Sequence, residues 1–320
     1  MGDIALPFLR SAFEAENYIC EEDLLITVSL ALKLGRPLLI EGAPGVGKTE
    51  IAKVLATVLE TELIRLQCYE GLDESKALYE WNYQGQLLKI QLMRDATNLP
   101  LREEEIFSAK YLLERPLLKA IRAEKQVVLL IDEIDKTDQE FEAFLFEVLS
   151  DFQVSIPEMG TIKARHIPVV VLTSNQEREL SDGLRRRCVY LYIDYPSPDK
   201  ESEILRCKIP GIGTRLVWEI TTAVHYLRYG LDLEKPPSTS ETLDWAAVLA
   251  EWRVEKLEPK HIQQTLGVLL KNHQDIVTFS HKIGFDGLCA MLRRKWDGAD
   301  LEAKADSLLA RALKKKNLQA

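Results

Sequence analysis

The chain has 320 residues and a formal net charge of −9, with 46% hydrophobic and 28% charged residues. This length allows one large domain or two smaller ones, and the composition is that of an ordinary soluble globular protein. The acidic balance argues against a duplex nucleic acid partner, which needs a basic face, and no apolar run approaches the length of a membrane span.

The first elements predict a parallel sheet. Apolar residues recur at helical spacing over residues 21–34, and a short buried strand is expected at 36–42. A second apolar helical face runs over 49–60, before a second strand at 62–68. The order strand, loop, helix, strand is typical of the start of an α/β sheet.

The segment that follows is less regular. Apolar and polar residues alternate over 88–92, which predicts one strand of a hairpin within residues 79–92. A helix is expected around 102–123, with Pro116 kinking or breaking it. We then expect a strand at 127–131, a helix at 138–151, a hairpin at 152–167 and strands at 168–175 and 188–194.

The pattern changes near residue 197, where strand-like runs give way to helical periodicity. We therefore expect two structured domains and a tail. They are an α/β core at 1–197 with hairpin inserts at about 79–92 and 152–166, a smaller all-helical domain at 198–275 and a helical C-terminal tail at 276–320.

Cellular location is predicted from signals that the sequence lacks. The first residues carry no basic segment followed by an apolar stretch, and five scattered cysteines form no C-x-x-C pair. We expect a cytoplasmic protein with reduced thiols, no zinc site and no membrane partner.

The segment GAPGVGKT at residues 42–49 matches the phosphate-binding pattern G-x-x-x-x-G-K-[ST]. Its glycines let backbone N–H groups approach phosphates closely, Lys48 supplies positive charge for the β- and γ-phosphates, and Thr49 offers a hydroxyl to Mg²⁺. The match follows a predicted strand and opens a predicted helix, as this motif requires; a plain glycine-rich turn is the alternative. The predicted nucleotide-binding residues are Gly42, Ala43, Pro44, Gly45, Val46, Gly47, Lys48, Thr49 and Glu50.

A second motif, VVLLIDEIDK at 127–136, ends a buried strand in two acidic residues. Ligands of an open α/β sheet bind at the carboxyl ends of its strands, so Asp132 is expected to reach Mg²⁺ and Glu133 to activate the attacking water. For this motif taken alone, the alternative is a strand that simply turns into solvent. Asp135 and Lys136 are expected to be capping and surface residues.

Two further polar features follow along the chain. Asn175 ends a predicted strand and is expected to bind the γ-phosphate or the attacking water, with a turn asparagine as the alternative. Arg185, Arg186 and Arg187 precede the last strand, at the end of the sheet opposite the acidic motif. Phosphoryl transfer needs positive charge on the γ-phosphate, so we expect one of them to serve the nucleotide of a neighbouring subunit, unless they form a solvated basic face.

In these motifs the chain resembles the AAA+ ATPases, specifically the MoxR family, over about residues 20–275. GAPGVGKT corresponds to the Walker A motif of that family, VVLLIDE to Walker B, and Asn175 to sensor 1. The stretch at 63–92 is more specific and resembles the CoxD-like subgroup, which is associated with maturation of carbon monoxide dehydrogenase.

The resemblance implies a P-loop AAA+ core followed by a helical lid, assembled into a homo-oligomeric ring that is usually a hexamer. Both inserts would face the pore and touch the client. Arg187 fits the arginine-finger position best, with Arg186 as second choice, and Gln67 lies where the family keeps a polar switch residue near the Walker B glutamate. Ser240 stands where a sensor 2 arginine is common, so lid closure would depend on another residue or hydrolysis would be slow.

The leading hypothesis is an ATPase that hydrolyses ATP with Mg²⁺ to remodel or activate a client metalloenzyme, acting with a partner that has a von Willebrand factor A (VWA) domain. A second hypothesis is a nucleic-acid motor or loader. In it, bases would stack on Tyr69, Tyr79, Trp81 and Tyr83, which otherwise pack the insert against the core. A third is a non-catalytic scaffold that binds nucleotide only to fix its shape.

Overall fold

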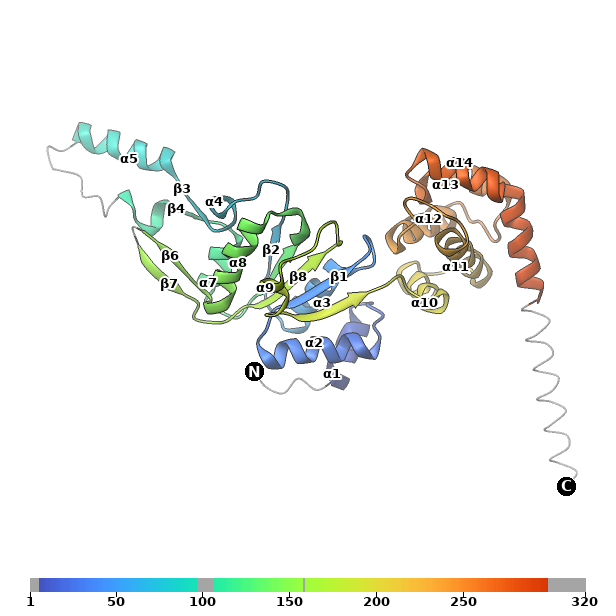
Figure 1. The fold of residues 1–320 in the computed structure, drawn as a ribbon, viewed down its shortest axis with the longest axis horizontal. Coiled ribbons are helices and arrows are strands. Elements are labelled where there is room, and N and C mark those ends of the chain that lie inside the picture. The colour runs from blue at the N-terminus through green and yellow to red at the C-terminus, as the bar shows by residue number, and fades with distance from the viewer. Residues whose placement is uncertain (1–5, 97–105, 158, 299–320) are drawn as a thin grey trace, which may run out of the picture. The chain divides into compact units, whose positions relative to one another are not determined.

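A computed structural model describes residues 6–96, 106–157 and 159–298 (Figure 1). The chain divides into two compact units, one that ends at Asp194 and one that begins at Tyr195. The first is an α/β unit, and the described part of the second is helical, as the change of sequence pattern predicts. Among the described residues, no helix combines the length and apolar character needed to cross a membrane.

A five-stranded parallel sheet forms the centre of the first unit. In spatial order its strands are β2 (Leu63–Gln67), β5 (Val128–Asp132), β8 (Val169–Ser174), β1 (Leu38–Gly42) and β9 (Val189–Ile193). Each strand closely overlaps one that an apolar run predicts. The inner strands β5 and β1 are buried along their whole length, as expected when helices cover both faces of a sheet.

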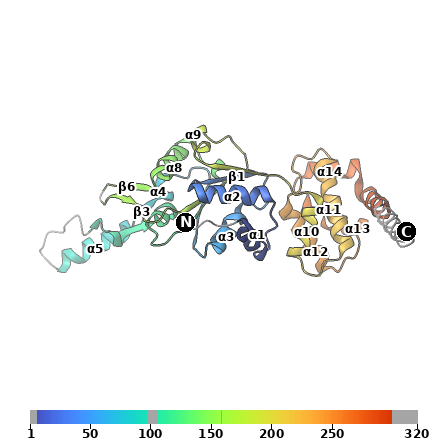
Figure 2. The ribbon, with the colours of Figure 1, turned by 90° about the horizontal axis from the view of Figure 1, so that it is seen from below.

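Helices cover both faces of this sheet (Figures 1 and 2). They are α1 (Leu6–Ala15), α2 (Glu22–Leu34), α3 (Lys48–Val58), α7 (Pro116–Arg122), α8 (Gln139–Asp151) and the short α9 (Asp182–Arg185). Successive side chains of a strand reach opposite faces. On β1, Leu38 and Ile40 accordingly pack with α1, α2 and α3, whereas Leu39 packs in the core that α7 and α8 share.

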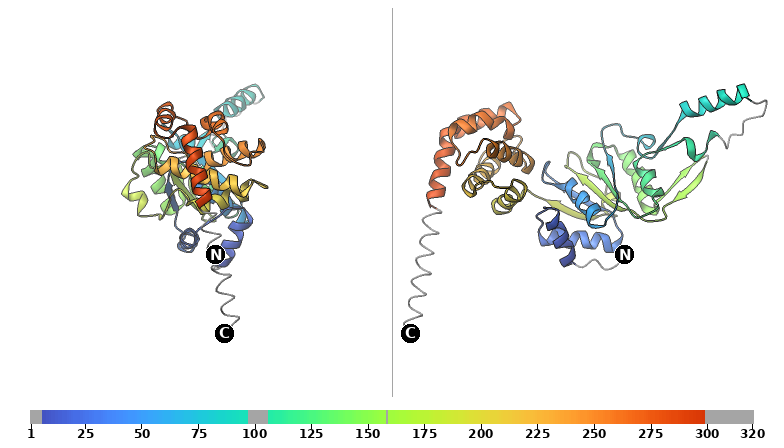
Figure 3. Two further views of the ribbon diagram at one scale, coloured as in Figure 1. Left: turned by 90° about the vertical axis from the view of Figure 1, so that its right-hand side faces the viewer. Right: turned by 180° about the vertical axis from the view of Figure 1, so that it is seen from behind.

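The carboxyl ends of the parallel strands lie at one edge of the sheet (Figure 3). The loop after β1 leads into α3, β5 ends at Asp132, and Asn175 directly follows β8. The register pairs Glu41 with Ser174 and Gln67 with Asp132. Motifs that are far apart in the sequence therefore meet at this edge, where ligands of open α/β sheets bind.

One of the two predicted hairpin inserts is confirmed. The elements of the inserts are β3 (Tyr79–Trp81), α5 (Tyr83–Ala96), β4 (Leu112–Glu114), β6 (Gln153–Ile156) and β7 (Gly160–Lys163). β6 and β7 pair antiparallel, as predicted for residues 152–166. β3 pairs with β4, but residues 88–92 lie in α5, so the prediction of a hairpin strand there is wrong.

Local chemistry explains why this segment is helical. Oδ1 of Asn82 accepts a hydrogen bond from Gly85 N at 2.9 Å, which supports the first turn, and glutamine, leucine and lysine are good helix formers. Alternation over so short a run does not distinguish strand from helix. Leu87, Leu88 and Leu92 remain exposed on α5, which lies away from the five-stranded sheet in Figures 1 and 3.

The helix expected around 102–123 is wrong in part. Its middle residues form β4, and α7 begins at Pro116 instead of being kinked by it. Proline suits the first helical turn, because an N–H group there would have no partner within the helix. Residues 102–105 of this prediction lie outside the described residues.

Amphipathic helices build the second unit around an apolar core of its own. They are α10 (Pro198–Lys208), α11 (Thr214–Tyr229), α12 (Thr239–Glu251), α13 (Pro259–Leu269) and α14 (His273–Lys282), and residues 284–298 are also helical. Trp245 is fully buried in this core, and its Nε1–H donates a hydrogen bond to Thr265 Oγ1 at 2.7 Å.

A buried ion pair joins three helices of this unit. Arg228 of α11 donates to both carboxylate oxygens of Glu201 on α10, at 2.9 and 2.7 Å. It also donates to Pro237 O at 2.6 Å and to Thr242 Oγ1 of α12 at 3.2 Å. These partners offset the cost of removing both charges from water.

We expect Arg228→Met to lower the free energy of unfolding of this unit by about 3–5 kcal/mol, because it leaves Glu201 buried without a counter-charge. Adding Glu201→Leu should recover most of this loss, because an apolar pair carries no desolvation penalty. Urea unfolding followed by tryptophan fluorescence measures both effects, because four of the five tryptophans lie in this unit. A double variant as unstable as the single one would contradict this account.

Candidate functional site

The loop between β1 and α3 has the backbone shape that its glycines predict. Gly45 and Gly47 have φ angles of 70° and 93°, in the left-handed region that favours glycine. At Gly42 a Cβ atom would lie 2.1 Å from the carbonyl oxygen of Ile193, so a larger residue would displace backbone. Such a loop, leading into the amino end of a helix, is an anion-binding arrangement.

Lys48, the first residue of α3, directs its ammonium group back into this loop. Its Nζ donates hydrogen bonds to the carbonyl oxygens of Gly42 at 2.7 Å and Ala43 at 2.8 Å, and to Oδ1 of Asn175 at 2.7 Å. These three acceptors match the three donors of an ammonium group. The structure thus joins the loop lysine to the asparagine that follows β8, two residues that the motifs single out separately.

Burial lowers the pKa of Lys48 to about 8, because desolvation disfavours its charged form. Nearby carboxylates oppose this shift, the largest effect coming from Asp135, followed by Asp132 and Glu133. The acidic cluster therefore keeps Lys48 mostly charged at neutral pH, where it can attract phosphate.

Asp132, at the end of β5, is buried among donors. Its Oδ1 accepts hydrogen bonds from Thr49 Oγ1 at 3.0 Å and Thr173 Oγ1 at 2.5 Å, and its Oδ2 accepts one from Arg65 Nε at 3.0 Å. The contact between Thr49 and Asp132 joins the two predicted Mg²⁺ ligands. Arg65, which lies on β2, is a contact that the motifs do not predict.

Glu133 follows with a left-handed backbone, φ 58° and ψ 50°, which is uncommon for a residue with a side chain. Thr173 Oγ1 supports this conformation by accepting a hydrogen bond from Glu133 N at 2.9 Å. Oε2 of Glu133 accepts hydrogen bonds from Gln67 Nε2 at 2.8 Å and Lys136 Nζ at 2.6 Å. Gln67 is thus beside the glutamate as expected, and Lys136 pairs with Glu133, which raises the pKa of Lys136.

Asp135 is not the capping or surface residue that the sequence suggests, because it is only 3% exposed. Its Oδ2 accepts hydrogen bonds from the backbone N–H groups of Asn175 and Glu177, both at 3.0 Å. Asp135 therefore fixes the segment that carries Asn175, and it also gives Lys48 its largest electrostatic support. Motif reasoning missed this role, which depends on the pairing of β5 with β8.

The oxygens of Thr49 and Asp132 suit Mg²⁺, which prefers oxygen ligands and is commonly held by one or two carboxylates together with phosphate oxygens. Within the described ranges, no group of three or more His, Cys, Asp or Glu residues could hold a metal ion. The residues present fit an ion that nucleotide phosphates help to hold, and such an ion would replace the hydrogen bond between Thr49 and Asp132.

The arginine cluster divides into one anchored residue and two exposed ones. Nη2 of Arg185 lies 2.8 Å from Oε1 of the buried Glu41. The side chain of Arg186 is 81% exposed, and the guanidinium of Arg187 lies 3.5 Å from the centre of the Phe146 ring.

Arg186 and Arg187 lie at the edge of the sheet opposite Lys48. They line a hollow together with Gly35 and Pro37, which precede β1. The structure therefore does not bring these two arginines to the P-loop of their own chain.

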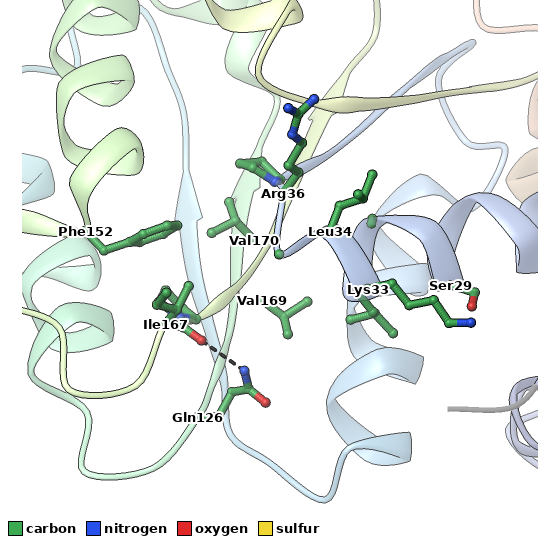
Figure 4. A pocket seen from close by; sticks show the side chains of 14 residues that line it. Ser29, Lys33, Leu34, Arg36, Gln126, Phe152, Ile167, Val169 and Val170 are labelled. Atoms are coloured by element: carbon green, nitrogen blue, oxygen red, sulfur yellow. Dashed lines mark hydrogen bonds between the residues drawn. The ribbon is translucent and has the colours of Figure 1, made fainter. Parts of the chain in front are cut away.

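A neighbouring hollow of about 490 Å³ lies between α2 and the amino ends of β1 and β8 (Figure 4). Leu34, Phe152 and Ile167 contribute apolar side chains to its lining, and Gln126 Nε2 donates to Ile167 O at 3.0 Å. Because this hollow is at the amino edge of the sheet, it is separate from the site formed by the motifs.

Comparison with known proteins agrees with this geometry. Residues 37–188 match the AAA domain, dynein-related subfamily, a range that includes every motif-bearing segment from β1 to the arginine cluster. The first unit contains an AAA+ ATPase domain. Its parallel sheet, P-loop and acidic strand end are the features of that fold.

The chain is similar to two curated proteins. Gas vesicle ATPase GvpN of Haloferax mediterranei is 24% identical over 212 residues, which are 63% of this chain and 59% of GvpN. Chaperone protein ClpB 2 of Parasynechococcus marenigrum is 31% identical over 137 residues, which are 42% of this chain and 13% of ClpB 2. The chain thus spans less than two thirds of the length of either relative.

A solved structure also resembles this chain. The Thermotoga maritima RuvB Holliday junction branch migration motor matches with a TM-score of 0.50 and 19% identity, covering 86% of this chain and 78% of RuvB. At this identity the similarity concerns the fold alone. The AAA+ core followed by a helical region is therefore confirmed.

We expect the affinity for ATP to fall as the pH rises above about 8, because Lys48 loses its charge above its lowered pKa and keeps it below. The dissociation constant should be about ten-fold larger at pH 9 than at pH 7, because it varies inversely with the fraction of Lys48 that is charged. Titration of a fluorescent ATP analogue without Mg²⁺ measures this. Lys48→Ala controls for ionisation of the nucleotide itself. If the affinity of the unaltered chain depends on pH no more than that of Lys48→Ala, the lowered pKa is not that of Lys48.

Asp135→Asn should move the midpoint of this pH profile to lower pH. The substitution removes the largest of the charges that hold the pKa of Lys48 up. Asp138→Asn is a matched control, because Asp138 caps α8 by accepting a hydrogen bond from Phe141 N. Identical midpoints in the two variants would show that Asp135 does not act on Lys48.

Proposed function

We propose that the chain hydrolyses ATP with Mg²⁺ where the P-loop, the end of β5 and the segment after β8 meet. The observation that carries this proposal is the hydrogen bond between Lys48 and Asn175, because it joins the loop to the expected sensor. The contact of Thr49 with Asp132 supports it, as do the AAA+ ATPase domain and a relative named as an ATPase.

Binding of the nucleotide exchanges one set of partners for another. Lys48 gives up the two loop carbonyls and Asn175 for β- and γ-phosphate oxygens. Asn175 is then free to contact the γ-phosphate or the attacking water. Mg²⁺, when held by Thr49 and Asp132, supplies positive charge to the phosphates.

Glu133 serves as the base that orients the attacking water and accepts its proton. In the structure its Oε2 is bonded to Gln67 and Lys136, and these contacts fix the orientation of the carboxylate. Gln67 is accordingly proposed to restrain Glu133 until nucleotide and neighbouring subunit are both in place.

Positive charge for the transition state is proposed to come from a neighbouring copy. Arg186 and Arg187 are exposed at the edge opposite their own P-loop, which suits donation to another subunit. A homo-oligomeric ring, hexameric by the family resemblance, places that edge of one subunit at the nucleotide edge of the next. Arg187 is the first candidate for the finger and Arg186 the second.

The finer role rests on the resemblance of residues 63–92 to CoxD-like MoxR proteins. We propose a cytoplasmic, chaperone-like machine that activates a client metalloenzyme of the carbon monoxide dehydrogenase type together with a VWA-domain partner. The exposed leucines of α5 support a client-binding insert. Residues 198–275 are proposed to be the lid, and no role is proposed for residues 276–320.

The alternative of a nucleic-acid motor receives less support. Trp81 is buried, and its ring lies 5.3 Å from that of Phe107 and 6.2 Å from that of Tyr79. Of the four aromatics named for this alternative, Tyr69 and Tyr83 are exposed, whereas Tyr79 and Trp81 pack within the insert and do not offer stacking faces to bases. The acidic charge of the chain points the same way.

Glu133→Gln should lower phosphate release by about 10²–10⁴-fold, because it removes the general base. ATP affinity should stay within about two-fold, because Glu133 does not contact the P-loop lysine in the structure. Steady-state phosphate release and analogue binding measure the two effects. Equal rates of hydrolysis by the unaltered chain and by Glu133→Gln would overturn the assignment of Glu133 as the base. Absence of hydrolysis in the unaltered chain would favour the hypothesis of a non-catalytic scaffold that only binds nucleotide.

The combined change Arg186→Ala with Arg187→Ala should lower turnover about a thousand-fold, as loss of an arginine finger does. Mixing this variant with Lys48→Ala should restore activity, because each copy supplies what the other lacks. The rate of phosphate release by the mixture, compared with that of each variant alone, measures whether one copy supplies arginines to the ATP site of another. An inactive mixture would show that these arginines do not act between copies.

A further inference from the structure

A buried carboxylate at the entrance to the P-loop takes no part in the proposed hydrolysis. Glu41 immediately precedes Gly42 and is 1% exposed. A charge buried to this degree is costly unless it is paired and hydrogen-bonded. Its carboxylate accepts hydrogen bonds from Arg185 Nη2 at 2.8 Å, Gln176 Nε2 at 3.0 Å and Tyr190 OH at 3.0 Å.

The Gln176 contact connects Glu41 to the sensor segment. Gln176 directly follows Asn175 and has a left-handed backbone with φ 63°, a conformation that persists where surrounding contacts fix it. Asp135 holds the backbone on both sides of Gln176, and Glu41 holds its side chain. Asn175 therefore stands in a segment that Glu41 restrains.

The Arg185 contact connects Glu41 to the arginines proposed to act between subunits. Arg185 is the last residue of α9, and backbone hydrogen bonds of 3.1 Å run without a break from the N–H of Arg185 to that of Cys188. Arg186 and Arg187 belong to this turn. The bond between Arg185 and Glu41 therefore sets the position of the turn against β1.

We propose that Arg185 is a positioning residue and not the arginine finger. Through Glu41 it links the segment that contacts the nucleotide of its own subunit to the turn that presents Arg186 and Arg187 to the next subunit. This inference rests on the proposed function.

Stability alone does not account for this arrangement. An ion pair between a buried carboxylate and a partly exposed arginine contributes little to stability compared with apolar residues of similar size. This pair lies between two elements that serve different ATP sites, and it brings together an anchored arginine and a sensor segment that are separate in the sequence.

The mixture of variants described above tests the proposal. Lys48→Ala can only donate arginines, and Arg186→Ala with Arg187→Ala can only accept them. Adding Arg185→Met to the donor should lower the activity of the mixture by about ten-fold or more, because displaced catalytic groups lose rate steeply. Adding it to the acceptor should lower activity less than adding it to the donor, because in the acceptor Arg185 acts on the working ATP site only indirectly, through Glu41 and the segment that carries Asn175.

A matched control separates this effect from the loss of an ion pair as such. Arg215 is 40% exposed and bonded to Glu219, which is 2% exposed. These exposed fractions closely match those of Arg185 and Glu41, which are 39% and 1%. Arg215→Met in the donor should leave the activity of the mixture unchanged. Arg185→Lys, which keeps the charge, should recover part of the loss, and thermal melting verifies that each variant folds.

Each outcome bears on a different statement. A loss confined to the acceptor, an equal loss on both sides, or no loss in the donor would overturn the role of Arg185 and leave the proposed function intact. An inactive parental mixture would overturn donation between subunits, and the inference with it. If Arg185→Met fails to fold, the partial loss expected for Arg185→Lys in the donor decides the question.

Discussion

The ammonium group of Lys48 is buried where three segments of the sheet edge converge, and the site depends on how its charge is compensated. Two backbone carbonyls come from the loop after β1, an amide oxygen comes from Asn175 after β8, and the supporting carboxylates come from the end of β5. A charge removed from water needs such partners. They become available together only because β5, β8 and β1 are neighbours in the sheet. The strand order is therefore a requirement for compensating the charge of Lys48.

The groups expected to handle the nucleotide already satisfy one another in the structure. Lys48 is bonded to Asn175, Thr49 to Asp132, and Glu133 to Gln67. A triphosphate must therefore break existing hydrogen bonds before its own can form, and part of its binding energy is used to rearrange the site. Among the interactions formed after this rearrangement, only those that are stronger in the transition state than with bound ATP accelerate hydrolysis.

Local signals predicted most of the elements and the motif residues, whereas most contacts across strands could not be predicted; the contact of Gln67 with Glu133 was expected from the family resemblance. The P-loop and the buried strands follow from short, distinctive stretches. The roles of Asp135 and Arg65 depend on which strands are neighbours and in which register. A charged residue inside an apolar strand, such as Glu41 or Arg65, does indicate a buried partner, but not which one. Local signals can also mislead. Helix α5 was predicted as a strand because its alternating pattern was too short to exclude a helix.

Three adjacent arginines look equivalent in the sequence, yet their surroundings separate them. Arg185 is committed to a buried carboxylate, and removing it would leave Glu41 without its counter-charge. Within the described part of the chain, the side chain of Arg186 pairs with an exposed aspartate at 3.8 Å, which contributes little, and the guanidinium of Arg187 packs on an aromatic ring. A bidentate bond to phosphate is stronger than either of these contacts. The cluster therefore combines one fixed guanidinium with two exposed ones, which is the division of roles that the proposed function requires.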